Sequence, residues 1–560
     1  TDTITTTTGS ISVTGSGSVA TYGGIYVEHA RLLSASGAIS LEGANSNASG
    51  YGILMNGSFA TLGKSGGTSS SAISLVADKV YIPAGSLAST GTLTIEPKTT
   101  GTTIGIAGGS GTLSLPASYF STNFANGFSS ITVGNATAGA ITIGNGTTQT
   151  LTLNDATTLK TNSTISGTAT TTITTSTNPA PDLTLQSNGA ISLAGPVSVT
   201  GQTSLSAGSA NNITLSNAGN NFTGAVSVVS GNNVSLTDSN GLTLGAITSA
   251  GTLDIASLTG NLVLSGAMST QSTSSSAIVL NAGKSTAAGT STGGDIQVSG
   301  GSITMGSGGR ATLYSGSISG STGLTTLIGS GTGRFRYNSD ESSSGYDTVN
   351  APLGTGMYAL YRERPTLSAI PSAANSVYGD AVSLSGVNAT VSGVNGDTSS
   401  TAGISGTASF TTTAAQNSNT GSYNITYSGG LSNLIGYAIA DSGLTGEYTI
   451  TQRPITITAT SSQSKIYGNS DPALTYTLEA NGTSRGLVGS DTFTGALSRA
   501  TGENVGATYA IGQGSLANTN YAITFAGSDF AITQRPITIT ANSSQSKIYG
   551  NSDPALTYTL

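Results

Sequence analysis

The side chains that could perform acid–base or metal chemistry are few and scattered along this 560-residue chain. His29 is the one histidine, it lies between Glu28 and Arg31, and cysteine is absent. A catalytic histidine needs neighbours that tune it, and a zinc site of the usual kind needs several His or Cys ligands. We therefore expect His29 to be a surface residue. The sequence predicts no catalytic residue, no cofactor site and no metal site.

Two short sequences, Gly63-Lys64-Ser65 and Gly283-Lys284-Ser285, have the ending of a phosphate-binding loop. That motif also needs a glycine five residues before its second glycine, and those positions hold Ser58 and Ile278. A helix must follow the loop, and neither sequence is followed by a helical pattern. We expect neither sequence to bind a nucleotide.

Carboxylates do not gather in the way that a calcium site or a glycosidase needs. Gly293-Gly294-Asp295 is shorter than the repeated Gly–Asp turn of calcium-binding β-helices and is not repeated. Asp471 and Asp553 lie near Asn and Ser and could help to bind calcium, but we expect each to cap its own turn backbone. Residues 100–154 hold no charged side chain. Because glycosidases need paired carboxylates in a groove, we expect that the chain is not an enzyme.

Tyrosine is the one enriched aromatic residue, with 21 copies. Tyr467 and Tyr549 occupy matching positions of a repeat that is described below. A tyrosine suits both sheet packing and contacts with sugars or proteins. For these two residues we expect packing in a core or a turn.

The composition shows which kind of scaffold must position these residues. Charged residues make up only 7% of the chain, against about a quarter in ordinary domains. Hydrophobic residues still make up 36%, and Val, Ile and Thr abound, which favours β-structure over disorder. The net charge of −7 excludes a basic nucleic-acid-binding surface and disfavours anionic membranes. No apolar run approaches the roughly 18 residues that span a bilayer, so we expect no membrane insertion.

Residues 1–330 contain many apolar–polar–apolar triplets, such as Leu113-Ser114-Leu115 and Ile191-Ser192-Leu193. Turn residues separate the triplets. This alternation predicts short strands with one buried face, which suit a parallel β-helix whose coils stack on one another. Stacking places equivalent side chains above one another, so charges are disfavoured, whereas Ser, Thr and Asn can hydrogen-bond along the stack. The best candidate for a short helical turn is Pro116–Asn126.

The C-terminal part contains an explicit repeat. Residues 451–478 and 533–560 differ only at Thr460 and Asn542, with an offset of 82 residues. An older copy begins at Arg364. We predict an all-β chain, a right-handed parallel β-helix rod followed by tandem small all-β repeat domains. The predicted bounds are 1–345 for the β-helix, 346–363 for a connector, and 364–452, 453–534 and 535–560 for two repeat units and the start of a third. A sandwich and a β-grasp topology both fit the units.

Two segments resemble known families. Residues 292–361, above all the run from Gly333 to Glu341, resemble the end of the filamentous-haemagglutinin type β-helix of two-partner secreted proteins. Coils around residues 220–222 and 241–245 are similar to the same family. The RP…YG units that begin at Arg364 resemble the mostly-β, glycine-rich (MBG) repeats of large bacterial adhesins.

The resemblance implies a fragment of a large bacterial adhesin, secreted or anchored at the cell surface. Such proteins leave the cell through an outer-membrane secretion barrel and attach to host cells, glycans or other bacteria by multivalent contacts. The families bring no catalytic residues and no cofactor. Two alternatives stay open, a passive stalk of a larger exoprotein and a β-helix carbohydrate-active enzyme. The near-identical repeats favour the stalk for the C-terminal part.

Overall fold

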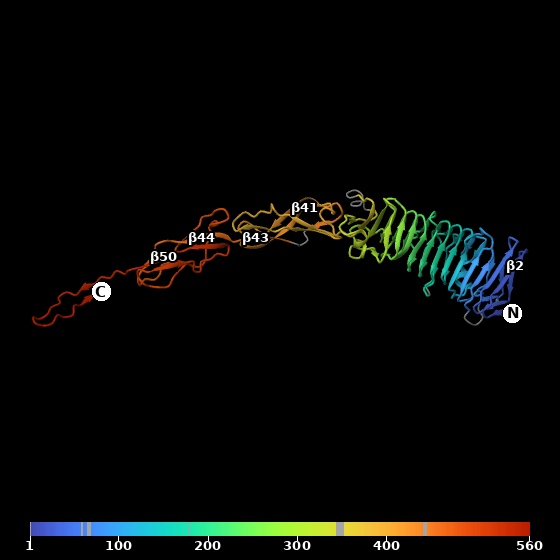
Figure 1. The fold of residues 1–560 in the computed structure, drawn as a ribbon, viewed down its shortest axis with the longest axis horizontal. Coiled ribbons are helices and arrows are strands. Elements are labelled where there is room, and N and C mark those ends of the chain that lie inside the picture. Colours follow the sequence, from blue (N-terminus) through green and yellow to red (C-terminus); the bar gives the residue numbers. More distant parts are fainter. Residues whose placement is uncertain (1, 58–59, 64–68, 179, 343–351, 441–444) are drawn as a thin grey trace. The chain divides into compact units, whose positions relative to one another are not determined.

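The computed structural model describes residues 2–57, 60–63, 69–178, 180–342, 352–440 and 445–560. Nearly all elements in these residues are strands, and those up to residue 361 form long stacks of parallel strands (Figure 1). The predicted fold class is confirmed, because the chain is a parallel β-helix followed by small β domains. No helix among the described residues is long and apolar enough to cross a membrane.

The triplets form the coils as their alternation predicts. In Leu113–Leu115 both leucines are fully buried and Ser114 is exposed. Successive coils pair in register, so that Ile165 lies beside Ile191 and the outward Ser166 beside Ser192. Each buried Leu or Ile contributes roughly 1.5–3 kcal/mol when it leaves water. The stack is therefore held by continuous apolar ladders inside and by backbone pairing between coils.

Two long sheets form faces that run along most of the stack. In pairing order, the first sheet contains β2 (Ile11–Gly17), β5 (Ile39–Asn45), β8 (Ile73–Val76), β10 (Thr92–Glu96), β13 (Ser130–Gly134), β16 (Thr157–Lys160), β19 (Leu183–Gln186), β22 (Thr203–Ser206), β25 (Val226–Ser230), β27 (Leu242–Ser249), β29 (Leu262–Leu264) and β32 (Ile296–Val298), with β30 (Ala267–Thr270) and β33 (Ser302–Thr304) branching at β27. The second contains β12 (Leu113–Leu115), β11 (Ile104–Ile106), β14 (Ile141–Ile143), β17 (Ile165–Gly167), β20 (Ile191–Leu193), β23 (Ile213–Leu215), β26 (Val234–Asp238), β28 (Leu253–Ser257), β31 (Ile278–Ala282), β34 (Arg310–Ser315), β36 (Gly356–Tyr361) and β35 (Phe335–Arg336).

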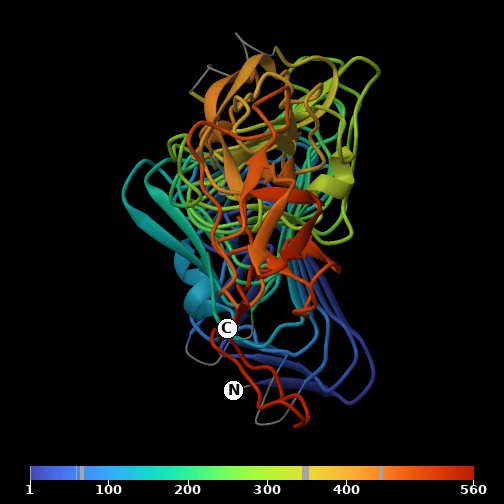
Figure 2. The ribbon, with the colours of Figure 1, turned by 90° about the vertical axis from the view of Figure 1, so that its left-hand side faces the viewer.

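Shorter sheets complete the coils. They contain β1 (Thr3–Thr6), β4 (Arg31–Ser34) and β7 (Thr61–Gly63); β3 (Ile25–Glu28), β6 (Ile53–Asn56) and β9 (Val80–Tyr81); and β15 (Gln149–Leu153), β18 (Thr171–Thr175), β21 (Val197–Val199) and β24 (Asn221–Phe222). The helical turn expected within 116–126 is present as the π-helix η1 (Tyr119–Asn123), the light-blue turn outside the coils in Figure 2. A second short helix, α1 (Leu324–Ile328), was not predicted.

Polar ladders also run through the stack, as the composition predicts. Asn220 is fully buried, and its side-chain oxygen accepts a hydrogen bond from the Val197 N–H. Its amide group donates to the carbonyls of Leu215 and Thr237. One asparagine thus joins three consecutive coils and satisfies polar groups that would otherwise be costly to bury.

Two compact units are distinguished by their internal contacts. The first comprises Thr1–Leu367 together with Ser392–Ser405 and Ser432–Ala438, and the second comprises the remaining residues to Leu560. Two segments from the predicted repeat unit 364–452 are therefore part of the β-helix unit. Residues 346–351 of the predicted connector lie outside the described residues, and β36 in its remainder is a strand of the second long sheet.

These two segments build an aromatic cap on the last coils. The Tyr337 ring stacks on Tyr361 at 5.7 Å, and the Tyr437 ring lies 4.5 Å from Tyr337. Asp397 Oδ2 accepts hydrogen bonds from both hydroxyls, 2.7 Å from Tyr337 and 2.8 Å from Tyr437. Burial raises the pKa of both tyrosines, so both remain donors. The cap covers the end of the apolar ladders, which would otherwise face water.

We expect Asp397→Ala to destabilise the first unit by about 2–4 kcal/mol, because two buried hydroxyls lose their acceptor. Thermal unfolding followed by circular dichroism measures the loss. Asp254→Ala, which removes an exposed carboxylate from β28, is the matched control and should leave the midpoint unchanged. Equal effects of the two changes would contradict the role assigned to the cap.

The second unit contains the small β domains. The first repeat forms the four-stranded sheet β38 (Ala374–Val377), β43 (Gly446–Thr451), β41 (Gly421–Ser432) and β40 (Ser405–Thr412), and the sheet β39 (Ala389–Ser392), β37 (Thr366–Pro371) and β42 (Ala438–Ala440). The second repeats this plan with β45 (Gln463–Ile466), β50 (Ser528–Thr533), β48 (Thr508–Gly512) and β47 (Ser498–Arg499), and with β46 (Tyr476–Leu478), β44 (Arg453–Ala459) and β49 (Tyr521–Ala526). The short pair β51 (Thr540–Ala541) and β52 (Tyr558–Thr559) begins the third.

Consecutive repeats are joined by an arginine from the RP sequence. The Arg453 side chain is 2% exposed, and its Nη1 donates to the Tyr378 carbonyl at 3.0 Å and to Asp380 Oδ1 at 2.7 Å. Its Nη2 and Nε donate to carbonyls of its own repeat, including Gly482 and Gly486. Arg453 therefore links the Tyr-Gly turn of one repeat to the body of the next. We call this contact the arginine junction.

The arginine of the third RP sequence, Arg535, makes part of the same arginine junction with the preceding repeat. Arg535 Nη1 donates to the Tyr467 carbonyl at 3.4 Å and to Asn469 Oδ1 at 3.3 Å. Asn469 occupies the place that Asp380 holds in the older copy, two residues after the tyrosine. The junction is therefore a property of the repeat and not of one pair of residues.

We expect Arg453→Met to destabilise the second unit by roughly 3 kcal/mol, because buried carbonyls and the Asp380 carboxylate lose their partner. Denaturant unfolding measures the change. Arg485→Met is the control, since the Arg485 side chain is 55% exposed and forms an ion pair with Glu479 at the surface. An Arg453→Met chain that unfolds at the same denaturant concentration as the parent would refute the junction.

Candidate functional site

The most distinctive exposed side chains lie on the first coils. Strands β3, β6 and β9 pair in parallel register, so Tyr26, Leu54 and Tyr81 lie next to one another on the outer side of their sheet. The ring of Tyr22 meets that of Tyr26 edge-on, with centroids 5.6 Å apart. We call Tyr22, Tyr26, Leu54, Tyr81 and their neighbour Tyr51 the tyrosine face.

Tyr51 extends the tyrosine face from the loop before β6. Its ring meets that of Tyr81 edge-on at 5.9 Å. Tyr22 is 58% exposed and Tyr81 is 44% exposed, so these rings contribute little to the apolar core. The inward positions of the same strands hold buried residues such as Ile25 and Val80, which already fill the coil. The tyrosine face is therefore additional to what the fold requires.

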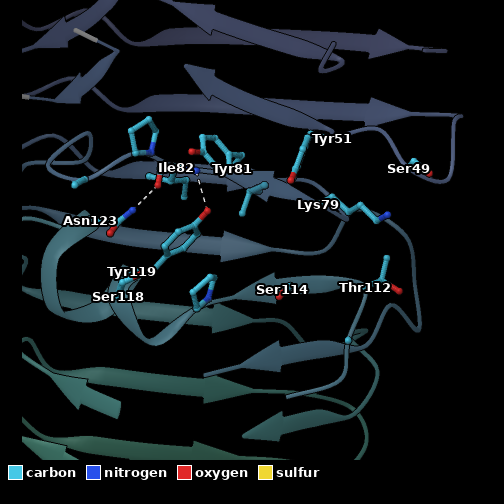
Figure 3. A pocket seen from close by; sticks show the side chains of 15 residues that line it. Ser49, Tyr51, Lys79, Tyr81, Ile82, Thr112, Ser114, Ser118, Tyr119 and Asn123 are labelled. Carbon is cyan, nitrogen blue, oxygen red and sulfur yellow. Dashed lines mark hydrogen bonds between the residues drawn. The ribbon is translucent and has the colours of Figure 1, made fainter. Parts of the chain in front are cut away.

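A groove of about 760 Å³ lies beside Tyr51 and Tyr81 (Figure 3). Its volume falls within the roughly 300–1,000 Å³ of typical small-molecule sites. One wall comes from β9 and the turn after it, and the other comes from β12 and η1. Ser114 and Thr112 place exposed hydroxyl-bearing side chains on the second wall.

The groove exists because the sheet is interrupted at this point. Strand β9 ends the three-stranded sheet β3–β6–β9, and β12 begins the long sheet that continues through β11 and β14. The two strands are neighbours but belong to different sheets. An unpaired strand edge leaves backbone groups that need other partners. Side chains of η1 supply those partners.

Tyr119 and Asn123 reach from η1 to the backbone just after β9 (Figure 3). The Ile82 N–H donates to the Tyr119 hydroxyl at 2.9 Å, and the Asn123 amide donates to the Ile82 carbonyl. Tyr119 is 6% exposed, and burial raises the pKa of its hydroxyl. The hydroxyl stays protonated, and among the described residues its proton has no acceptor. Tyr119 thus offers a fixed, unused donor at the groove.

The groove has little charge. Among the residues that line it, Lys79 is the one charged side chain, and its ammonium group donates to the Ala48 carbonyl. No Asp, Glu or His is among these lining residues. The arrangement can hold a ligand by ring contacts and hydrogen bonds, but it offers no pair of carboxylates for glycosidic bond cleavage.

The residues that the sequence singled out are not brought together. His29 is exposed in the turn between β3 and β4, with a φ of 51°, and does not line the groove. Gly283-Lys284-Ser285 forms a turn after β31, with no helix following it, and Lys64 and Ser65 lie outside the described residues. Asp295 accepts hydrogen bonds from Ser317.

The expectation for the repeat tyrosines is wrong in part. Tyr467 is 50% exposed and Tyr549 is fully exposed, so neither lies in a core. Their counterpart in the older copy, Tyr378, is 6% exposed and packs against Tyr521 with centroids 5.6 Å apart. Sequence reasoning missed the tyrosine face, although its signal was present. Within residues 1–313 the five tyrosines are Tyr22, Tyr26, Tyr51, Tyr81 and Tyr119, and none lies beyond the first coils.

Comparison with known families gives two matches. Residues 455–531 match the MBG domain (YGX type), and residues 162–229 match a family described as repeats of unknown function. The chain is therefore a repeat protein whose second small β domain is similar to MBG domains. No curated protein and no solved structure matches it. The MBG match covers the second repeat, and the Tyr-Gly turn that receives each arginine junction fits the name of its type.

The MBG domain also shows what Asp471 does. Asp471 accepts from Lys465 Nζ at 2.5 Å and from Arg499 Nε at 2.6 Å, and Glu503 pairs with the same two cations. The expected role of a carboxylate that caps its own turn is therefore wrong for Asp471. Asp553 likewise pairs with Lys547. Among the described residues no group of three or more His, Cys, Asp or Glu side chains could hold a metal ion.

We expect acid to weaken the MBG domain through Asp471. The hydrogen bond from Arg499, with that from Lys465, lowers the pKa of Asp471 to about 2. Its stabilising effect is present above the unfolded-state pKa of about 3.9 and is lost as the pH falls through about 2. Because Asp471 is 40% exposed, the loss should be below about 1 kcal/mol.

Unfolding midpoints of the parent and of Asp471→Asn between neutral pH and pH 2 test this expectation. The two curves should differ at neutral pH and converge at the acid end. Added calcium should shift neither midpoint. Curves that stay parallel across the whole range, or a midpoint raised by calcium in the parent alone, would contradict the assignment.

Proposed function

We propose that the chain is part of a bacterial adhesin that is exported to the cell surface and attaches to cells or surfaces through many weak contacts. The observation that carries this proposal is the tyrosine face beside an open groove. A row of half-exposed rings is rare on a surface that is otherwise rich in Ser and Thr, and exposed aromatic residues are enriched where proteins bind partners. The MBG match supports the same conclusion.

The proposal includes the export route of the chain and its location at the cell surface. The resemblance to filamentous-haemagglutinin type proteins favours two-partner secretion through an outer-membrane barrel. The near absence of charges and the lack of cysteine suit a chain that passes unfolded through such a barrel and stacks into coils afterwards. We further propose that the chain is not an enzyme, because no carboxylate or histidine lines the groove.

Attachment is tested with beads coated with the whole chain. We expect the beads to be retained on host cells or on other bacteria under flow, and retention to rise steeply with the density of the coat, as multivalent binding requires. Beads coated with an unrelated charge-poor β-helix are the control. Retention no greater than that of the control on host cells, bacteria and abiotic surfaces would refute the proposal.

A passive stalk is the second candidate, and it is favoured for the repeats alone. The copies at 451–478 and 533–560 differ at one position, and the arginine junction joins each repeat to the next. Deletion of residues 453–534 should then shorten the distance that the chain spans without changing the retention of each molecule. A changed retention per molecule would assign binding to the repeats.

A further inference from the structure

We propose that the tyrosine face and its groove form a binding site for an uncharged, extended glycan. The inference rests on the proposed attachment function and specifies the ligand class at one site. It follows from three observations: the placement of the tyrosines, the unused hydrogen-bonding groups, and the charge of the groove.

The placement of the tyrosines matches a flat, repeating ligand. Parallel register sets the rows of β3, β6 and β9 about 4.8 Å apart, so Tyr26 and Tyr81 flank Leu54 at roughly 10 Å from one another. Tyr22 and Tyr51 widen the row at its two ends. A sugar ring has an apolar C–H face that packs on an aromatic ring, and its hydroxyls point sideways toward polar groups. A row of rings at fixed spacing therefore suits consecutive sugars of one chain.

The rest of the outer surface shows that these tyrosines are not needed for folding. The outward positions of the second long sheet include Thr142, Ser166 and Ser192. Those coils stack without any outward ring. The residues of the tyrosine face lie next to the interruption of the sheet after β9, so the rings and the groove occur together.

The groove supplies hydrogen-bonding groups at its floor and wall. The Tyr119 hydroxyl is held by the Ile82 N–H and keeps its own proton for a ligand. Hydroxyls of Ser114 and Thr112, on the same wall as η1, can both donate and accept. Such fixed polar groups beside ring faces match the alternation of C–H and O–H groups on a sugar. A peptide would instead require a free strand edge, and Tyr119 and Asn123 already occupy the Ile82 backbone.

The low charge of the groove favours uncharged glycans over anionic ones. Lys79 is the one cation among the lining residues, and its ammonium group already donates to a carbonyl. A sulfated or carboxylated glycan would need several basic side chains, which this groove does not offer. An uncharged chain needs none. The ligand class is therefore a neutral polysaccharide.

Titration calorimetry of the whole chain with short neutral β-linked oligosaccharides of glucose, xylose and mannose tests the inference. We expect binding to at least one of them, weakened about tenfold by Tyr81→Ala, which removes an exposed ring. Tyr119→Phe removes only the hydroxyl and should also weaken binding. Tyr467→Ala removes a ring of similar exposure from the MBG domain and should not. A cooperative unfolding transition well above the assay temperature shows that each variant is folded.

Three results would overturn the inference. These are no binding to any neutral oligosaccharide, tighter binding to sulfated or sialylated ones or to an extended peptide, and equal binding by the parent and Tyr81→Ala. The bead assay separates this failure from that of the proposed function. If Tyr81→Ala beads are retained as well as the parent, attachment stands and the site is elsewhere. If neither is retained, attachment fails, whereas the calorimetry still decides whether the groove binds a glycan.

Discussion

In-register pairing between successive coils is the interaction on which the β-helix depends. Each strand is only a few residues long and could not persist alone, because a short strand buries too little apolar surface to offset its lost chain entropy. Pairing with the coils above and below satisfies the backbone, and the inward Leu, Ile and Val residues form continuous ladders. The same register disfavours charge, since an outward charge that recurs in the next coil would face its equivalent within about 5 Å. Composition and fold are therefore two consequences of one geometry.

A stack has ends and interruptions, and the less common side chains are found there. At the last coils the apolar ladders end on Tyr337, whose hydroxyl donates to Asp397. At the break after β9, the Ile82 N–H has no neighbouring strand to pair with, and it donates instead to the Tyr119 hydroxyl. In the second unit, the Arg453 side chain donates to the Tyr378 carbonyl of the preceding repeat. In each place a buried polar side chain stands in for a missing backbone partner, which is why its removal is costly.

The local pattern of the sequence predicts the coils, because period-two alternation in triplets such as Ile191–Leu193 has one structural solution when many copies follow one another. It also predicts the helical turn near Tyr119, since the triplets stop there. It does not predict the cap, because nothing local in Ser392–Ser405 shows that this segment belongs to the β-helix. Nor does the spacing of Arg and Tyr within a repeat reveal that Arg453 bonds to the turn of the preceding repeat.

The tyrosine face shows why a binding site on such a fold is hard to find in a sequence. Tyr26, Tyr51 and Tyr81 are each separated from the next by about one coil, so register, and not proximity in the chain, makes them neighbours. The length of the coils fixes that register, and the break after β9 fixes where the surface opens. The regular coils expose mostly small polar groups such as Ser166 and Ser192. An interruption supplies both a hollow and unpaired polar groups, so the irregular coil is where a β-helix can acquire a ligand without loss of its core.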